Sequence, residues 1–222
     1  GTVQTANNTA LLAVAKATVF ALNDATGWAN TNGFCLSWPP AVRVSDATDA
    51  AVLVGRFRSA LDRVMGVNGN IHLGGGMLEN SGATVAINDM LLQVRSSELT
   101  VADPHSCLHT NCIPCSCNQW QSHAGRLRFF PVWNSTVLGP ASFVKLRAYG
   151  AFLVSAAIDS AGRLSDVSIQ SEMGGTCVFE WTDGRTPSVL SNGKAVAVAE
   201  VEASTFAFAT VTGGRYVITS SD

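Results

Sequence analysis

The chain has 222 residues, of which 47% are hydrophobic, so it can bury a sizeable core and is not expected to be disordered. Its 14 basic and 16 acidic residues give a formal net charge of -2, and Lys and Arg are not clustered, so nucleic acid is a poor candidate partner. The longest apolar run, near Ala10 to Leu22, is interrupted by Lys16 and is shorter than the roughly 20 residues that a bilayer requires. No membrane span is expected.

The first part of the chain carries helical signals. Between Thr9 and Leu22 the apolar residues surround the helix axis, which predicts a helix that is buried on most sides and ends at Asn23-Asp24. A loop rich in Gly and Asn follows, and Trp38-Pro39-Pro40 then opens a short helical stretch, because proline is tolerated in a first turn.

Two longer helices are expected next. Asp46 or Thr48 caps the second helix, in which Leu53, Phe57, Ala60, Leu61 and Val64 recur at helical spacing. The third helix begins after a glycine-dense loop over residues 66–82 and continues to about Val94. Two amphipathic helices cannot enclose the very apolar first helix, so we expect another segment or a companion chain to supply more helices.

After about Ser96 the pattern changes to short runs of β-branched and aromatic residues separated by turn signals, which predicts an antiparallel β-sandwich. The expected strands lie at residues 127–133, 143–146, 151–158, 164–170, 177–181, 195–201, 205–211 and 216–219. The predicted fold is therefore α+β, with helices over residues 1–96, a Cys-rich insertion or linker over 97–124 and a β-sandwich over 125–222.

Several signals favour a secreted or extracellular protein. The six cysteines form an even set, and Asn7 and Asn134 each begin an N-glycosylation sequon. Gly1-Thr2-Val3 shows neither an initiator methionine nor the regions of a signal peptide, so the visible start is expected to be a cleavage product or a truncation. A cytosolic protein remains the alternative, because sequons also occur by chance.

The segment that contains Cys107, Cys112, Cys115 and Cys117 poses a choice between zinc and disulfides. A C-x4-C-x2-C-x-C run is not a standard zinc pattern, and the sequons favour oxidised cysteines, so we expect disulfides and no metal. Cys35 and Cys177 can pair with this segment or with each other.

Three stretches together resemble glycoside hydrolase family 95, which comprises α-L-fucosidases and α-L-galactosidases. They are Thr26-Gly27-Trp28 with Ser37-Trp38 and Arg43, residues 78–93 from Leu78-Glu79-Asn80 onward, and residues 125–133 with 146–154. The resemblance covers most of the chain from Thr9 to Thr219, and residues 97–124 are an insertion relative to the family. It implies helices of an (α/α)6 barrel followed by a C-terminal β domain.

The resemblance also implies an inverting hydrolysis of α-L-fucosyl or α-L-galactosyl linkages, with carbohydrate as partner and no cofactor. The proton donor of the family belongs to an earlier part of the barrel that nothing here matches, so this chain alone is expected to be inactive. Where the fucosidase motif has Asp, this sequence has Leu78, and Glu79 follows one place later. Glu79 is the candidate catalytic residue, and a helix-capping carboxylate is its alternative role.

The candidate substrate-binding residues are Asn80, His72, Trp28 and Trp38. Asn80 can both donate and accept hydrogen bonds, as recognition of sugar hydroxyls requires, and His72 lies on the same loop. Trp28 and Trp38 can stack on a sugar ring, with core packing as the alternative. The rival to the enzyme hypothesis is a catalytically inactive extracellular glycan-binding or structural glycoprotein on the same scaffold.

Overall fold

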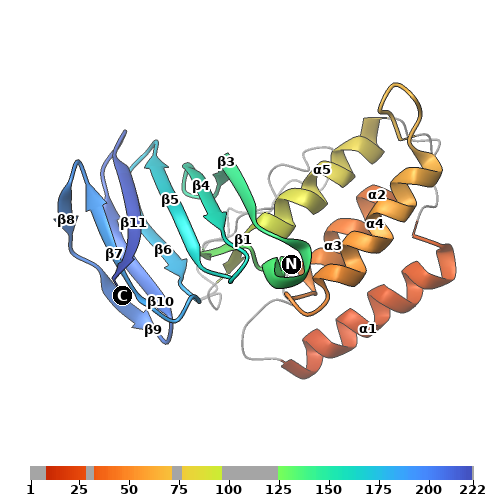
Figure 1. The fold of residues 1–222 in the computed structure, drawn as a ribbon, viewed down its shortest axis with the longest axis horizontal. Coiled ribbons are helices and arrows are strands. Elements are labelled where there is room, and N and C mark those ends of the chain that lie inside the picture. The colour runs from red at the N-terminus through yellow and green to blue at the C-terminus, as the bar shows by residue number, and fades with distance from the viewer. Residues whose placement is uncertain (1–8, 29–32, 72–76, 97–124, 222) are drawn as a thin grey trace, which may run out of the picture.

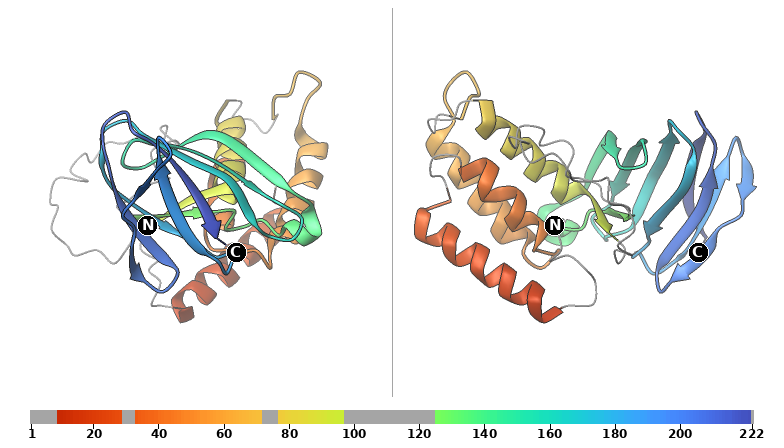
Figure 2. Two further views of the ribbon diagram at one scale, coloured as in Figure 1. Left: turned by 60° about the vertical axis from the view of Figure 1, so that its left-hand side comes forward. Right: turned by 180° about the vertical axis from the view of Figure 1, so that it is seen from behind.

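The computed structural model of the chain describes residues 9–28, 33–71, 77–96 and 125–221. These residues form an α+β fold in which a group of helices precedes two mostly antiparallel β-sheets (Figure 1). The helices lie at one end of the molecule and the sheets at the other, and the view from behind shows the same separation (Figure 2). The predicted order, helices first and strands second, is confirmed.

The helical part has an aromatic core. Its helices are α1 (Thr9–Thr26), α2 (Gly33–Leu36), α3 (Trp38–Arg43), α4 (Ala50–Val64) and α5 (Met77–Leu91). The ring of Trp38 is fully buried and lies 4.7 Å from that of Trp28 and 4.9 Å from that of Phe57, measured between centroids. Phe34 of α2 is also fully buried and packs on Phe57 at 5.7 Å. Large aromatic rings therefore hold the short helices against α4.

Helix α1 is more exposed than its composition predicts. Within α1, which is described in full, Asn23 is the one buried residue, whereas Leu11, Val14 and Leu22 are 44%, 62% and 62% exposed. Val19 and Phe20 pack partly against the aromatic core, and Figure 1 shows α1 at the outer side of the helical part. The expected burial on most sides is thus absent from the described residues, and an apolar face of α1 remains uncovered.

Helix α5 begins earlier and ends earlier than predicted. Its bounds, Met77 to Leu91, place Glu79 and Asn80 in the first turns of the helix instead of in the preceding loop. Gly82 is buried inside the helix, which its small size permits, so the glycine does not mark the helix start as expected. The chain then passes directly from α5 into a strand.

The strands form a five-stranded and a six-stranded sheet. The five-stranded sheet has the order β1-β2-β6-β10-β9, and the six-stranded sheet has the order β3-β4-β5-β11-β7-β8. Neighbouring strands are antiparallel except for β2 and β6, which are parallel. The bounds are β1 (Leu92–Ser96), β2 (Gly125–Phe129), β3 (Ala141–Ala148), β4 (Phe152–Ile158), β5 (Leu164–Ser171), β6 (Gly175–Glu180), β7 (Thr186–Ser191), β8 (Lys194–Val196), β9 (Ala199–Glu202), β10 (Thr205–Thr210) and β11 (Arg215–Ser221).

The inward faces of the two sheets form one hydrophobic core, which agrees with a β-sandwich. Along β4 every second residue from Phe152 to Ile158 is buried, as expected for a strand with one face on the core. Phe179 of β6 is fully buried and Phe208 of β10 is 3% exposed, and their rings are in edge contact at 6.0 Å. The alternation of apolar and polar residues along the strands therefore determines which face of each sheet is buried in the sandwich.

The two halves join through the backbone. Strand β1 pairs antiparallel with β2 in a register that sets Leu92 opposite Phe129. Beyond β2, the Phe130 N–H donates to Leu91 O at 2.7 Å, and Val132 packs into the helical core. A short helix, α6 (Ser135–Leu138), follows. The sheet therefore begins at Leu92, inside the stretch expected to be helical.

None of the helices over the described ranges is long and apolar enough to cross a membrane, which agrees with the sequence prediction.

Candidate functional site

Glu79 is a fully buried carboxylate in the first turn of α5. Its Oε2 accepts a hydrogen bond from the backbone N–H of Phe34 at 2.9 Å, which ties α5 to the start of α2. Its Oε1 is also buried and has no hydrogen-bond partner among the described residues. The first turn of a helix favours a negative charge, because its free N–H groups carry partial positive charge. The predicted catalytic residue is thus held in place through one oxygen, and the other is buried without a hydrogen-bond partner in the described part of the chain.

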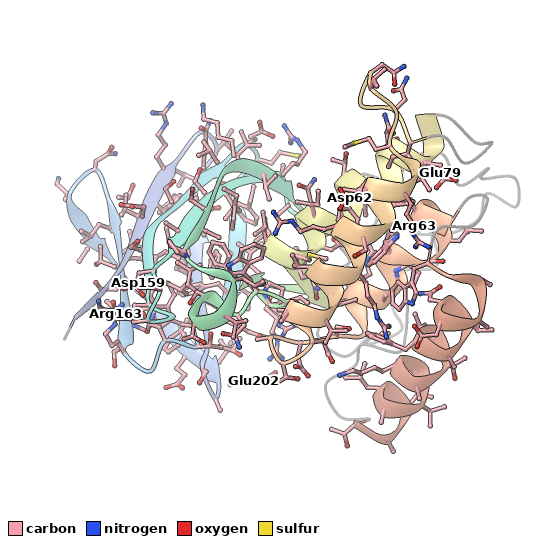
Figure 3. The ribbon with its side chains drawn as sticks, turned by 45° about the vertical axis from the view of Figure 1, so that its right-hand side comes forward. Asp62, Arg63, Glu79, Asp159, Arg163 and Glu202 are labelled. Carbon is pink, nitrogen blue, oxygen red and sulfur yellow. The ribbon has the colours of Figure 1, made fainter. Side chains whose placement is uncertain are left out.

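Glu79 does not cap α5, which was the alternative role considered above. Its hydrogen bond runs to a different helix and not to an N–H of α5. Figure 3 shows Glu79 among the helices, well apart from the labelled sandwich residues Asp159 and Glu202. The residue therefore belongs to the helical half of the molecule alone.

Asn80 does not face the same place as Glu79. Its Oδ1 accepts from the backbone N–H of Ile71 at 2.9 Å, and its Nδ2 donates to Asn70 Oδ1 at 3.2 Å. Consecutive helical residues point about 100° apart, so an inward Glu79 leaves Asn80 turned toward the loop that precedes α5. In this structure Asn80 holds the loop through residues 70–71 in place.

The two tryptophans that were candidates for sugar stacking are core residues. Trp38 is 0% exposed and donates its indole N–H to Trp28 O at 3.2 Å. Trp28 is 5% exposed, donates to Asp24 Oδ1 at 2.6 Å and lies under the guanidinium of Arg56 at 4.9 Å. Neither ring presents a face to solvent, so the alternative role, core packing, is the one that the structure displays.

Other predicted residues lie outside the described part of the chain. His72, Asn7 and the four cysteines of the Cys-rich segment (Cys107, Cys112, Cys115, Cys117) fall there, as does the side chain of Cys35. Asn134 is described and caps α6, where its Oδ1 accepts from the backbone N–H of Thr136 at 3.2 Å.

Cys177 is a free thiol in the structure, which differs from the expected disulfide. It is fully buried at an inward-facing position of β6, opposite Phe208 of β10. Burial raises the pKa of this thiol to about 12. Cys177 therefore serves as a small apolar core residue.

A second buried carboxylate on α5 was not identified from the sequence. Asp89 is 1% exposed and accepts a hydrogen bond from Arg43 Nε, at the end of α3, at 2.7 Å. Burial raises the pKa of Asp89 to about 6 and outweighs the opposing effect of Arg43. Helix α5 is enclosed on more than one side, and only the fold reveals that Arg43 reaches Asp89.

Glu79 and Asp89 do not form an acid/base pair. Ten residues separate them along one helix, which corresponds to about 15 Å of rise, whereas the two carboxyl groups of an inverting glycosidase are roughly 6.5–9.5 Å apart. Asp89 is also engaged by Arg43, which leaves Glu79 as the carboxylate with a free oxygen.

A metal role finds no support in the described ranges. No three His, Cys, Asp or Glu side chains gather there in a way that could hold a metal ion.

Comparison with models of known protein families finds no match, and no curated protein is significantly similar to the chain.

Proposed function

We propose that the chain is the C-terminal part of a secreted glycoside hydrolase related to family 95, which cleaves α-L-fucosyl or α-L-galactosyl linkages with inversion when further helices complete its barrel. The observation that carries this proposal is the buried carboxylate of Glu79, with one oxygen fixed by Phe34 and the other without a partner in the described residues. A group held in this way is suited to act as a general base in a site that excludes bulk water.

In this mechanism Glu79 Oε1 takes a proton from a water molecule. The water oxygen bonds to the anomeric carbon, the glycosidic bond breaks, and an acid from the missing part of the barrel protonates the departing oxygen. The Phe34 N–H keeps the carboxylate oriented, since a base acts only within hydrogen-bond reach of the proton it abstracts.

The exposed side of α1 supports the need for further helices. Leu11, Val14 and Leu22 leave apolar surface uncovered on a helix that is apolar around its whole axis. In a complete (α/α)6 barrel, neighbouring helices would bury that surface, which stabilises by about 25 cal/mol for each Å² removed from water. The proposed partner is thus the rest of the barrel, from the same polypeptide or a companion chain.

A second candidate has its own support. Full burial of Glu79 and its bond to Phe34 also suit a purely structural tie between α5 and α2. The protein would then be an inactive extracellular glycan-binding or structural glycoprotein on the same scaffold.

The substitution Glu79→Gln distinguishes the two candidate functions. Mass spectrometry of the native protein first identifies any companion chain, and the variant is then assayed together with that chain. The amide oxygen of Gln can still accept from Phe34, so a structural tie survives while a base is lost. We expect hydrolysis of 4-nitrophenyl α-L-fucoside or α-L-galactoside to fall by at least about 100-fold. Glu172→Gln, at an exposed carboxylate of the sandwich, is the matched control.

An inverted anomer in the product, followed by NMR, completes the test. Activity that persists in the Gln variant would refute the role of Glu79 as the base. A native protein that is inactive on both substrates would refute the enzyme and favour the scaffold.

A further inference from the structure

A pocket of about 270 Å³ lies in the β-sandwich, apart from Glu79. It is formed by the segment that follows β6 and by the turn between β9 and β10, at the end of the five-stranded sheet where β9 is the edge strand. Its lining residues are Trp181, Thr182, Gly184, Arg185, Thr186, Glu200, Ser204 and Phe206. All of them are described, and none has been assigned a role above.

The walls of the pocket are fixed by internal contacts. The backbone N–H of Trp181 donates to the backbone oxygen of Ser204 at 2.9 Å, which joins the segment after β6 to the turn between β9 and β10. Asp183, whose side chain is 1% exposed, accepts from Arg185 Nη2 at 2.6 Å and from the Arg185 backbone N–H at 3.0 Å. Because these bonds exist without a ligand, binding would require little reorganisation.

One polar group in the wall lacks the partner that it requires. Trp181 is 3% exposed, and its indole N–H is buried with no acceptor among the described residues. By contrast, the indole N–H of Trp133 donates to Gly139 O at 3.0 Å. Buried indole N–H groups normally find an acceptor, so a lining residue of the pocket carries a donor whose hydrogen bond the described residues leave unmade.

The charges of the pocket select against ions. The guanidinium of Arg185 is already neutralised by Asp183, and Glu200 adds a negative charge, which disfavours an anion such as phosphate. A simple cation offers no acceptor to the Trp181 N–H. The hydroxyl groups of Thr182, Thr186 and Ser204 instead match a neutral ligand that both donates and accepts hydrogen bonds.

We propose that this pocket binds a single neutral sugar ring. Phe206, which is half-buried, provides an apolar surface for the C–H face of the ring, and the hydroxyl-bearing side chains provide polar partners. The volume of about 270 Å³ lies below the roughly 300–1,000 Å³ of pockets for drug-sized ligands, which suits one ring and not an oligosaccharide. The site does not depend on catalysis at Glu79 and would serve an enzyme or a binding protein equally.

The test follows the indole N–H signals of the full chain by NMR as D-galactose or L-fucose is added, with choline and inorganic phosphate as contrasting probes. Trp181→Phe keeps an aromatic ring, removes the N–H and identifies its signal. We expect the Trp181 signal to shift with a neutral sugar at roughly 10 mM, a concentration that saturates a site with a Kd of about 1 mM. The Trp133 signal is the internal control and should remain in place.

Variants then locate the site. Trp181→Phe should weaken sugar binding about fivefold, as loss of one hydrogen bond implies. Thr182→Trp changes an exposed residue, so the fold should persist while the added ring fills the pocket and abolishes binding. No shift of the Trp181 signal with a sugar, a shift with choline or phosphate, or binding that survives Thr182→Trp would overturn the proposal.

Discussion

The buried pair of Arg43 and Asp89 predicts how stability changes with pH. The folded-state pKa of Asp89 is about 6, against 3.8 for an unperturbed Asp. Between these values the folded chain holds a proton that the unfolded chain releases, so the free energy of unfolding falls as pH rises through this window. The difference corresponds to a contribution of about 3 kcal/mol that is fully present below pH 3.8 and is lost once pH exceeds 6.

Asp89→Asn is the perturbation that isolates this contribution. Asn is close in shape, and its amide oxygen can still accept from Arg43 Nε, but it does not titrate. Urea unfolding followed by circular dichroism at pH 5, 6 and 7 should show the native chain losing roughly 1 kcal/mol more than the variant over that range.

The choice of range and variant removes competing effects. Lowered pKa values at Asp46, Asp159 and Glu172 act in the opposite direction, because their stabilisation is lost as pH falls below their unfolded values of 3.8, 3.8 and 4.5. The four histidines of the chain are common to both proteins, so their effect cancels in the comparison. If Asp89→Asn changes with pH as the native chain does, Asp89 does not hold its proton to about pH 6 and the reasoning fails.

Three further predictions concern packing and backbone geometry. Trp38→Ala should cost about 3–5 kcal/mol in urea unfolding because the ring is fully buried, whereas Met173→Ala, at a 77% exposed residue, should change stability by less than about 0.5 kcal/mol. The buried Cys177, with its raised pKa, should resist a thiol reagent in the folded chain and react only after denaturation. If Cys177 of the folded chain is labelled as fast as an exposed thiol, the prediction is wrong. Gly174→Ala should lower the free energy of unfolding by more than Gly193→Ala in the same assay. Both glycines have positive φ, but only a Cβ at Gly174 would approach backbone, at 3.2 Å from Thr212 N. Equal losses of stability would refute this steric reason.

The sandwich could be predicted from sequence because its signals are local. The Asn192-Gly193 turn is one example: its two residues have φ of 50° and 75°, the paired positive values that a tight hairpin between β7 and β8 requires. Alternating apolar residues from Phe152 to Ile158 likewise predicted β4. Such patterns need only a few neighbouring residues to be recognised.

Two strand assignments failed where distant pairing decides the structure. Strand β7 was not predicted, and Pro187, its second residue, argues against a strand. In the structure β7 pairs with β11 along one side, and on the other side β8 pairs only with Val189 to Ser191. Pro187 therefore has a neighbouring strand on one side only, and the N–H that proline lacks is not required on the other. The strand expected over 195–201 is divided into β8 and β9, which belong to different sheets.

The candidate site was only partly predictable for the same reason. Glu79 was named from its motif, but its burial depends on contact with α2, forty-five residues earlier in the chain. Asp89 gave no local signal, since its partner Arg43 lies forty-six residues away. Burial and pairing of charges are properties of the assembled helices, and a pattern along one helix does not contain them.

The pairing of β1 with β2 has a consequence for the Cys-rich segment between them. Ser96 and Gly125 are directly opposed in the sheet, so a chain that connects them has to bridge only the gap of about 5 Å between two neighbouring strands. The entropic cost of closing such a loop grows only with the logarithm of its length. Residues 97–124 can therefore be exchanged for a two-residue turn, or for a longer insert, while the register of both strands is preserved. The fold thus offers a graft site where new sequence can be added at little energetic cost.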